Sequence, residues 1–316
     1  MANERELIER IAARVGIRGG VVTGVGDDAA VLANGTVLAL DMLVDGVHVR
    51  RATHSPADIG HKALAVNMSD IAAMGADPVA ALVGLGVPPD LSADDVDAMY
   101  EAMEKLAMLH GMAIVGGDIT EAPVLTLAVS ITGHTRSGVA PVLRSGGRAG
   151  DLLVITGPLG AAACGLMLLD DTLLGTGVPT ADALIAAQRR PTPLIAQGHR
   201  LADAGAHAMM DISDGLLIDA QRLGVASGLH AEINLSAVPR AEGVDQVAAA
   251  AGRDAAMLAA TGGEDYQLLA AMPANATLPR DVVVVGLLRA GTPGVSAVVR
   301  GRDVTPAHLG WEHGGH

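Results

Sequence analysis

Six aspartates in short motifs flanked by turns constrain this chain more than any other feature of its sequence. They are spread from residue 28 to residue 214, and most of them lie beside apolar runs. Two carboxylates roughly 4 to 6 Å apart repel by about 3 to 4 kcal/mol at an effective dielectric of about 20. A fold that gathers these side chains must therefore protonate them or bind cations between them. The six are Asp28, Asp41, Asp70, Asp118, Asp211 and Asp214.

The residue type at these positions predicts the kind of ligand. Oxygen ligands favour Mg²⁺, Ca²⁺ or Mn²⁺ over zinc, and Mg²⁺ is the ion that accompanies polyphosphates. The alternative for any single aspartate is a role as a helix cap or turn residue, which aspartates commonly have. We expect this alternative to fail for the whole set, because Asp41 and Asp118 are each expected to end an apolar strand, where sites in mixed sheets usually lie.

The overall composition excludes several classes of protein. The chain has 316 residues and a formal net charge of −14, and half of its residues are apolar. It has no Phe, two Tyr and one Trp. An acidic chain with so few aromatic rings lacks the basic surface and the stacking platforms of a nucleic-acid binder. Its length is enough for two domains of ordinary size, with cores built from small side chains.

Several well-known site motifs are missing from the sequence. The chain has no Gly-x-x-x-x-Gly-Lys phosphate loop, and the glycines at 24 and 26 are followed by acids rather than by the rest of a dinucleotide fingerprint. It also lacks a His-Glu-x-x-His zinc motif and a set of cysteine ligands. A polyphosphate would therefore be held through metal ions.

Cysteine usage and the terminal sequence predict a cytoplasmic protein. Cys164 is the only cysteine, so an intrachain disulfide is impossible, and its apolar surroundings predict a core residue rather than a nucleophile. The charged N-terminus predicts no signal peptide. The run 152–169 has no charge and reaches the lower length limit of a membrane span, but Gly157 and Pro158 interrupt it. We expect a strand, a turn and a helix there, and no membrane partner.

The spacing of apolar residues predicts a mixed α/β chain of two domains. The segment 135–150, rich in glycine and arginine, is the expected junction, with domains at 1–137 and 138–316. Pro56 and Ser92 mark helix starts. Helices are expected at 4–14, 56–74, 92–110, 161–169, 181–189, 194–204 and 215–227. Strands are expected at 36–43, 79–87, 112–115, 124–132, 152–156, 266–271, 282–288 and 295–299.

Six motifs occur in an order that points to a family. They lie at 24–31, 41–48, 62–76, 116–118, 211–216 and 262–266. Together they resemble the thiamine-monophosphate kinase family, of the superfamily that also holds aminoimidazole ribonucleotide synthetase, selenophosphate synthetase and a hydrogenase-maturation protein. The resemblance covers residues 4 to about 311, and the segments 62–76 and 262–266 are distinctive for the kinases.

The resemblance implies both a fold and an activity. The fold is that of aminoimidazole ribonucleotide synthetase, with an N-terminal mixed-sheet domain that binds ATP and metal and forms a homodimer interface, and a C-terminal α/β domain. The implied activity is ATP-dependent phosphorylation of thiamine monophosphate to thiamine diphosphate, with several Mg²⁺ ions and with ATP as co-substrate. Because the acceptor is an ionised phosphate monoester, we expect direct in-line transfer without a general base or a nucleophile.

Residue roles follow from the resemblance, position by position. The six aspartates match metal ligands. The nucleotide contacts are Gly117, Asp118, Arg144 and Ser213. The substrate contacts are His48, Glu264 and Trp311. The neighbouring acids without an assigned role are Asp27 and Asp45.

Each of these roles has a physical reason and a simpler alternative. Arg144 offers a planar fork for phosphate oxygens, or it is a solvated linker residue. His48 follows a turn and is expected near a substrate phosphate, although a lone histidine is usually structural or exposed. Glu264 suits the cationic, amino-bearing thiamine rings, or it is a solvated turn acid. Trp311 lays a ring face over a thiazolium cation for about 0.5 to 2 kcal/mol, or it caps an apolar edge.

Three departures from the family pattern affect these assignments. Ala39 and Leu40 stand where the family often has Ser or Thr, so a metal there would rely on backbone carbonyls or water. His110 stands where an aromatic residue is expected, which affects the adenine contact. Leu194 stands where arginine is common. None of the three removes a metal carboxylate.

Two other functions stay open at this point. The first is another ATP-dependent kinase or synthetase of the same superfamily that acts on a different small acceptor. The motif 262–266 and Trp311 argue against it. The second is a catalytically silent regulator that binds nucleotide and metal, which the departures leave open.

Overall fold

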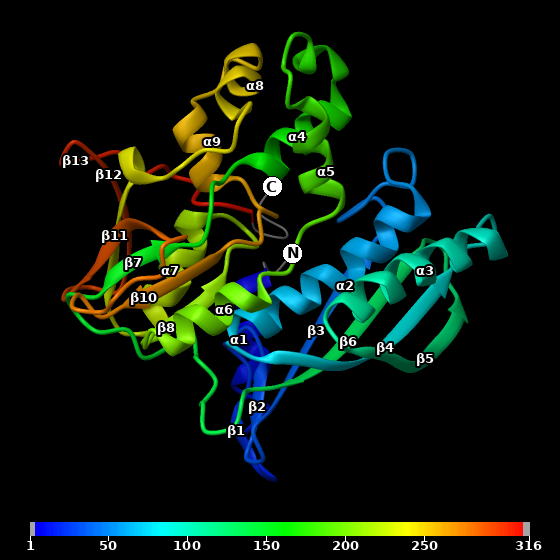
Figure 1. The fold of residues 1–316 in the computed structure, drawn as a ribbon, viewed down its shortest axis with the longest axis horizontal. Coiled ribbons are helices and arrows are strands. Elements are labelled where there is room, and N and C mark those ends of the chain that lie inside the picture. Colours follow the sequence, from blue (N-terminus) through cyan, green and yellow to red (C-terminus); the bar gives the residue numbers. More distant parts are fainter. Residues whose placement is uncertain (1–3, 312–316) are drawn as a thin grey trace.

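The computed structural model describes residues 4–311 as two α/β halves that meet along one long helix (Figure 1). Each half is built around its own mixed sheet. The helix between them is α2 (Pro56–Ala73), which contacts elements of both halves. The architecture is the two-domain α/β fold that the sequence predicts.

The N-terminal half holds a sheet of six strands among the described residues. The strands are β1 (Val21–Thr23), β2 (Ala30–Leu32), β3 (Thr36–Val44), β4 (Asp77–Val87), β5 (Ala113–Glu121) and β6 (Thr126–His134). The helices are α1 (Glu4–Ala12), α2 and α3 (Ala93–Leu109). The strand order is β1-β2-β3-β6-β4-β5, and only β4 and β5 run parallel, joined through α3. Helices α2 and α3 cover one face of this sheet, and β5 is left at an edge (Figure 1).

The C-terminal half holds a second sheet, of seven strands in the described part of the chain. The strands are β7 (Leu152–Ile155), β8 (Ala208–Asp211), β9 (His230–Asn234), β10 (Leu268–Met272), β11 (Val283–Arg289), β12 (Gly294–Val299) and β13 (Arg302–Asp303). The α-helices are α4 (Ala161–Asp170), α5 (Ala181–Arg189), α6 (Ile195–Asp203), α7 (Leu216–Ala226), α8 (Val244–Ala250) and α9 (Ala255–Thr261). The order is β13-β12-β9-β11-β7-β10-β8, which puts β8 at the edge nearest α2.

Helix α2 is buried on nearly all sides because both halves pack on it. It begins with a capping box, in which Ser55 and Asp58 satisfy each other's backbone N–H groups, and Pro56 follows at the first helical position. Its buried polar residues include Lys62, Asn67 and Ser69, an unusual set for a helix interior. A helix that carries buried polar groups between two cores is well placed to present them to a shared site.

Small residues let the helices approach closely, as the composition predicts. A Cβ added at Gly60 of α2 would lie 2.1 Å from the carbonyl oxygen of Met99 in α3. One added at Gly198 of α6 would lie 2.1 Å from the carbonyl oxygen of Ala72 in α2. The apolar core of the N-terminal half also continues across α2 to Met209 of the C-terminal sheet. The two halves therefore share a packed apolar interface.

The predicted long elements are confirmed, with ends that differ by a few residues. Strand β5 is the main exception, because it continues through the two glycines to residue 121 instead of ending at 115. Strands β1, β2, β8 and β9 and helices α8 and α9 were not expected; each has seven residues or fewer, which is too short to show a clear period. The predicted domain boundary at 137/138 lies in the segment between β6 and β7.

The close approach of α6 to α2 gives a test of the interface between the halves. Gly198→Ala would force a methyl group into the backbone of α2, so we expect a loss of about 1 to 3 kcal/mol in the free energy of unfolding. Thermal or denaturant unfolding measures it. The matched control is Ala196→Ser, which adds one atom on the exposed side of the same helix and should change stability little. Equal stability of the two variants would contradict the described packing.

Candidate metal and nucleotide site

A cleft with a volume of about 1010 Å³ lies between the two halves. Residues from both sheets and from α2 line it. The predicted site residues that line it are Asp28, Asp41, His48, Asp70, Arg144, Asp211, Ser213, Asp214, Glu264 and Trp311. Residues that are 283 positions apart in the sequence thus face one space.

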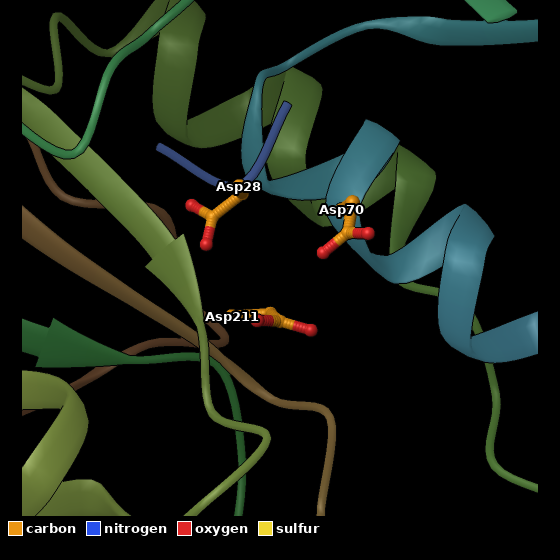
Figure 2. A group of neighbouring side chains, drawn as sticks. All are labelled: Asp28, Asp70 and Asp211. Atoms are coloured by element: carbon orange, nitrogen blue, oxygen red, sulfur yellow. The ribbon is translucent and has the colours of Figure 1, made fainter. Parts of the chain in front are cut away.

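Three carboxylates form the centre of the cleft, and we call them the acidic triad: Asp28, Asp70 and Asp211 (Figure 2). One carboxylate oxygen from each lies within 4.8 Å of the others. Asp28 comes from the segment between β1 and β2, Asp70 from the last turns of α2, and Asp211 from the end of β8. The triad therefore exists only when the two halves are assembled.

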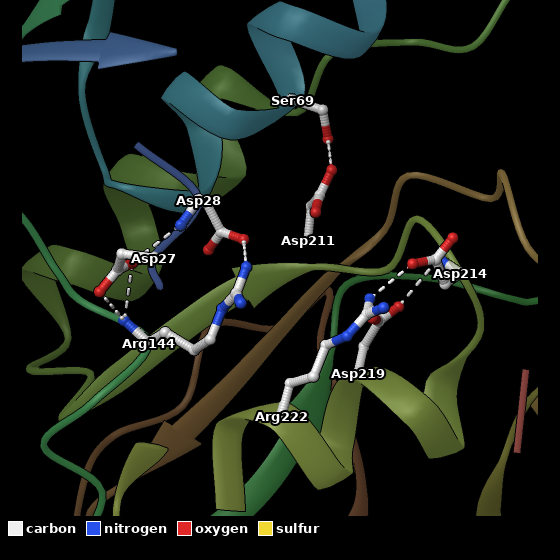
Figure 3. Close-up of polar contacts among 8 residues, drawn as sticks. All are labelled: Asp27, Asp28, Ser69, Arg144, Asp211, Asp214, Asp219 and Arg222. Atoms are coloured by element: carbon white, nitrogen blue, oxygen red, sulfur yellow. Dashed lines mark hydrogen bonds and ion pairs between the residues drawn. The ribbon is translucent and has the colours of Figure 1, made fainter. Parts of the chain in front are cut away.

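Hydrogen bonds hold two members of the triad, Asp28 and Asp211, in place (Figure 3). The Arg144 guanidinium donates to Oδ1 of Asp28 at 2.5 Å. The Ser69 hydroxyl, one residue before Asp70 on α2, donates to Oδ2 of Asp211 at 2.6 Å. Oδ2 of Asp28 is buried and has no hydrogen-bond partner within residues 4–311. A buried, unpartnered carboxylate oxygen beside two further carboxylates is suited to a hard cation.

The electrostatics of the triad point the same way. Burial raises the pKa of Asp28 above the ordinary value, and the charge of Arg144 opposes the rise without cancelling it. Burial also raises the pKa of Asp70, and the nearby charges of Asp41 and Asp211 raise it further. For Asp211, burial raises the pKa and the charge of Asp28 adds to it. Without a cation, ionisation of this cluster is unfavourable.

Asp41 lies beside the triad, and its position corrects one expectation. It is inside β3 and not at the end of a strand, as Asp118 is inside β5, so the argument from strand ends was wrong for both. The backbone N–H of Asp41 donates to Oδ1 of Asn67 on α2 at 2.8 Å. Burial, followed by the charges of Asp214 and Asp28, raises the pKa of Asp41 to about 6. The side chain of Asp41 lines the cleft because of the face of β3 on which it lies, and not because of a turn.

Asp214 belongs to a second group of charges at the cleft, which the sequence analysis did not detect. Arg222 of α7 donates to Asp214 at 2.6 Å and to Asp219 at 2.8 Å (Figure 3). Asp219 also accepts from the backbone N–H groups of Asp214 and Gly215. Burial raises the pKa of Asp219 to about 7, against the opposing charge of Arg222. The spacing of three residues between Asp219 and Arg222 on a helix was the available signal.

Asp27, which had no assigned role, orients the nucleotide-contact candidate Arg144. Both of its carboxylate oxygens lie 3.1 Å from the backbone nitrogen of Arg144 and accept its N–H (Figure 3). Burial and the neighbouring Asp28 charge raise the pKa of Asp27 to about 6. The contact joins the segment between β1 and β2 to the segment between the two sheets.

Two predicted residues lie outside the cleft. Gly117 and Asp118 face a separate groove of about 940 Å³ at the free edge of the N-terminal sheet, next to Tyr100 and Glu101 of α3. Across the sheet, Gly117 pairs with Val83, Val83 with Val129, and Val129 with Asp41. Gly117 and Asp41 are therefore three strand spacings apart, which is about 14 Å. Within one chain, Asp118 is therefore separated from the triad.

The three predicted substrate contacts lie at the rim of the cleft. The ring of His48 accepts the backbone N–H of Val44 at Nδ1, 3.2 Å away, so a neutral ring carries its proton on Nε2. The Trp311 backbone N–H donates to the carbonyl of Asp214 at 2.9 Å, and its side chain is half-exposed. Glu264 has a left-handed backbone, with φ of 67°, and its N–H donates to the carbonyl of Ser213. Such a conformation is unfavourable outside glycine and is frequent at functional sites.

The departures from the family pattern fall in distinct places. Leu40 is exposed and lines the cleft, whereas Ala39 is buried in the sheet. His110 follows the last turn of α3, and burial lowers its pKa. Leu194 is buried just before α6.

Two other expectations about the chain have outcomes in the structure. Cys164 is wholly buried in α4, and burial raises the pKa of its thiol to about 11, which confirms a core residue. The uncharged run 152–169 divides into β7 and α4 as expected. None of the helices in the described residues is both long and apolar enough to cross a membrane.

Comparisons with known proteins agree with the fold and the cleft. Two family models match the chain: "AIR synthase related protein, N-terminal domain" at residues 26–135 and "AIR synthase related protein, C-terminal domain" at residues 148–292. The thiamine-monophosphate kinase of Mycobacterium tuberculosis is 39% identical, over 79% of this chain and 74% of its own length. That of Salmonella typhimurium is 34% identical, over 93% and 92%.

Solved structures of thiamine-monophosphate kinases have a fold similar to that of this chain. A structure described as AaThiL complexed with AMPPCP and TMP has a TM-score of 0.86 and 33% identity, and covers 98% of this chain and 97% of its own. Thiamine monophosphate kinase from Aquifex aeolicus has a TM-score of 0.83 and 32% identity, with 96% and 98% covered. The fold and cleft define a two-domain α/β protein with an acidic site between its halves. The chain belongs to the AIR synthase related family and, within it, to the thiamine-monophosphate kinases.

The raised pKa of Asp41 makes the stability of the metal-free protein depend on pH. Well below pH 3.8, the ordinary pKa of the group, it is protonated in both the folded and the unfolded state, and its contribution to stability is fully present. As the pH rises from 3.8 to about 6, the unfolded chain ionises while the folded chain stays protonated, so the folded state loses stability. Asp41→Asn removes this loss, so in chelator we expect the variant to gain up to about 3 kcal/mol over the parent between pH 4 and pH 7.

Denaturant unfolding of both proteins across this pH range measures the difference. Mg²⁺ with nucleotide should reverse its sign at pH 7, because ligand binding then stabilises the parent more than the variant. A difference that does not change with pH would contradict the described burial of Asp41.

Proposed function

We propose that this chain phosphorylates thiamine monophosphate to thiamine diphosphate, with ATP as the phosphoryl donor. The observation that carries the proposal is the acidic triad, to which both halves of the chain contribute residues in one cleft. The family supports it, because the chain belongs to the thiamine-monophosphate kinases. A triphosphate and a phosphate monoester are both strongly anionic. A site that brings them together needs positive charge more than it needs a base.

The residues of the cleft fit several Mg²⁺ ions. The acidic triad, Asp41 and Asp214 would hold them, and the clearest candidate ligand atom is the buried Oδ2 of Asp28, which has no hydrogen-bond partner in the part of the chain that the structure describes. Bound ions would neutralise phosphate charge and align the two substrates. Arg144 would add a fixed fork for phosphate oxygens, with its backbone held by Asp27.

The phosphoryl group would pass directly between the two substrates. The acceptor oxygen is already ionised at neutral pH, so no side chain has to remove a proton. The only cysteine is buried in α4 and does not line the cleft, and the cleft aspartates would be occupied as cation ligands. Direct in-line transfer, in which the protein supplies positioning and charge, follows from this arrangement.

The organic part of the acceptor would lie at the rim of the cleft, away from the triad. Glu264 offers a carboxylate to an amino-bearing cationic ring system, and Trp311 offers an aromatic face. His48, with its proton on Nε2, can donate to a phosphate oxygen. These roles would favour an acceptor that carries a cationic, amino-bearing ring over a phosphate monoester that lacks one.

We also propose a homodimer that completes the site. Strand β5 is a nine-residue edge strand, and the nearby side chains Leu82, Val115 and Ile119 are more than half exposed. A long apolar edge of this kind offers unpaired backbone groups and apolar side chains to another chain. Asp118 on β5 then joins the other carboxylates when the β5 edge of one subunit meets the cleft of the second.

A single assay separates this function from the two rivals. We expect Mg²⁺-dependent ADP release with thiamine monophosphate and none with other phosphate monoesters. Asp70→Asn should reduce turnover below about a tenth of the parental value, because it removes one triad ligand. The matched control is Asp97→Asn on the exposed side of α3, which should stay active. A variant at position 70 that keeps more than a tenth of the activity would exclude a metal role for that residue.

Subunit mixing tests the shared site. Asp70→Asn and Asp118→Asn should each be inactive alone. If Asp118 of one subunit serves the cleft of the other, random mixed dimers contain one intact site, and about a quarter of the parental activity returns. Refolding the two variants together and measuring ADP release checks this. Failure to recover activity, with mixed dimers isolated through a different affinity tag on each variant, would place Asp118 in the site of its own subunit.

A further inference from the structure

Lys62 is an unusual residue for this chain. The sequence has only two lysines, Lys62 and Lys105, although lysine and arginine together number 21. Lys105 is exposed and pairs with Glu101 one helical turn away. Lys62 lies on α2 and is wholly buried, a position that lysine almost never takes unless its charge is paired. Its burial therefore needs an explanation.

The ammonium of Lys62 is completely satisfied by residues at the rim of the cleft. It forms an ion pair with Oε1 of Glu264 at 2.6 Å. It donates to Oε1 of Gln188 at 3.3 Å and to the backbone carbonyl of His48 at 3.4 Å. An ammonium has three N–H donors, so each donor has one acceptor. Two of the three acceptors belong to the residues proposed to contact the substrate.

The network continues from Lys62 to fix both oxygens of Glu264. The side-chain amide of Gln188, on α5, donates to Oε2 of Glu264 at 2.5 Å. Oε1 of Gln188 lies 3.0 Å from Nε2 of His54, so it accepts from His54 as well as from Lys62. The direction of each hydrogen bond is consistent, because Gln188 uses its oxygen for two donors and its nitrogen for one acceptor.

From these contacts we propose that Lys62 is a positioning residue for recognition of the organic part of the acceptor. It fixes the orientation of Glu264, so that the remaining lone pairs of the carboxylate face the cleft. An ionised carboxylate only accepts hydrogen bonds, so it selects an acceptor that carries N–H donors and positive charge. This inference rests on the proposed function, and it adds the residue that makes Glu264 selective.

The position of Lys62 excludes a direct role at the phosphates. Its side chain is wholly buried and does not line the cleft, whereas Glu264 is about a quarter exposed there. Lys62 precedes Asp70 by eight residues on the same helix, which corresponds to about 12 Å along the axis. One rigid helix therefore holds the rim and the triad at a fixed separation. The ion pair also joins the two halves, because Glu264 belongs to the C-terminal half.

A double-mutant cycle with Lys62→Met and Glu264→Gln tests the proposal. We expect Lys62→Met to lower kcat/KM for thiamine monophosphate about 30-fold or more, mainly through KM. The KM for ATP and the stabilisation by Mg²⁺ with nucleotide should stay within about twofold of the parent. The double variant should be no worse than Glu264→Gln alone, because Lys62 acts through Glu264.

The double variant also guards against a folding defect. Replacing one member of a buried ion pair destabilises a protein strongly, whereas replacing both destabilises it much less. If Lys62→Met does not fold, the comparison of the double variant with Glu264→Gln still decides the question. Lys105→Met is the matched control on the surface and should behave like the parent.

The outcomes separate this inference from the proposed function. An unchanged KM for thiamine monophosphate in folded Lys62→Met would overturn the inference. A further loss in the double variant, similar in size to that of Lys62→Met alone, would do the same, because the two effects would then be independent. An inactive parental chain would overturn the proposed function and the inference that rests on it.

Discussion

Repulsion among buried carboxylates is the constraint on which this structure depends. The acidic triad takes one residue from the segment after β1, one from α2 and one from the end of β8, and it holds their oxygens within 4.8 Å. Burial and mutual repulsion make the ionised form of these three carboxylates unfavourable when no cation is bound. The packing of α2 between two apolar cores supplies the stability that keeps them together. The fold thus holds an arrangement of charge that either protonation or a bound cation relieves.

Much of this arrangement was predictable from the sequence. The long helices and strands were predicted from the spacing of their apolar residues, and the ordered motifs indicated six acids, of which all but Asp118 line the cleft. Helix α2 was predicted from Pro56 and its apolar spacing, yet its near-complete burial was not, because burial depends on elements more than a hundred residues away. The position of Asp118 was missed for a related reason. The two glycines before it suggested a strand end, whereas the strand continues along the edge of the sheet.

The residues that the sequence analysis missed share one property. Asp27, Lys62, Gln188 and Arg222 act on another residue rather than on a ligand. Asp27 holds the backbone of Arg144, and Arg222 joins Asp214 to Asp219. Such roles depend on a partner that is distant in the chain or on a particular rotamer, so no local pattern identifies them. A supporting residue of this kind is found only after the fold brings its partner to it.

The two ends of the cleft solve the problem of buried charge in opposite ways. At the triad, Arg144 reaches only one oxygen of Asp28, and the other is left without a partner among residues 4–311. At the rim, Lys62 and Gln188 engage both oxygens of Glu264. The first end therefore leaves a carboxylate oxygen available to a cation, while at the second end both oxygens are engaged by the protein. In the function that we propose, an acceptor with a phosphate at one end and a cationic ring at the other would have one favourable orientation in the cleft, with its ring at Glu264 and its phosphate at the acidic triad.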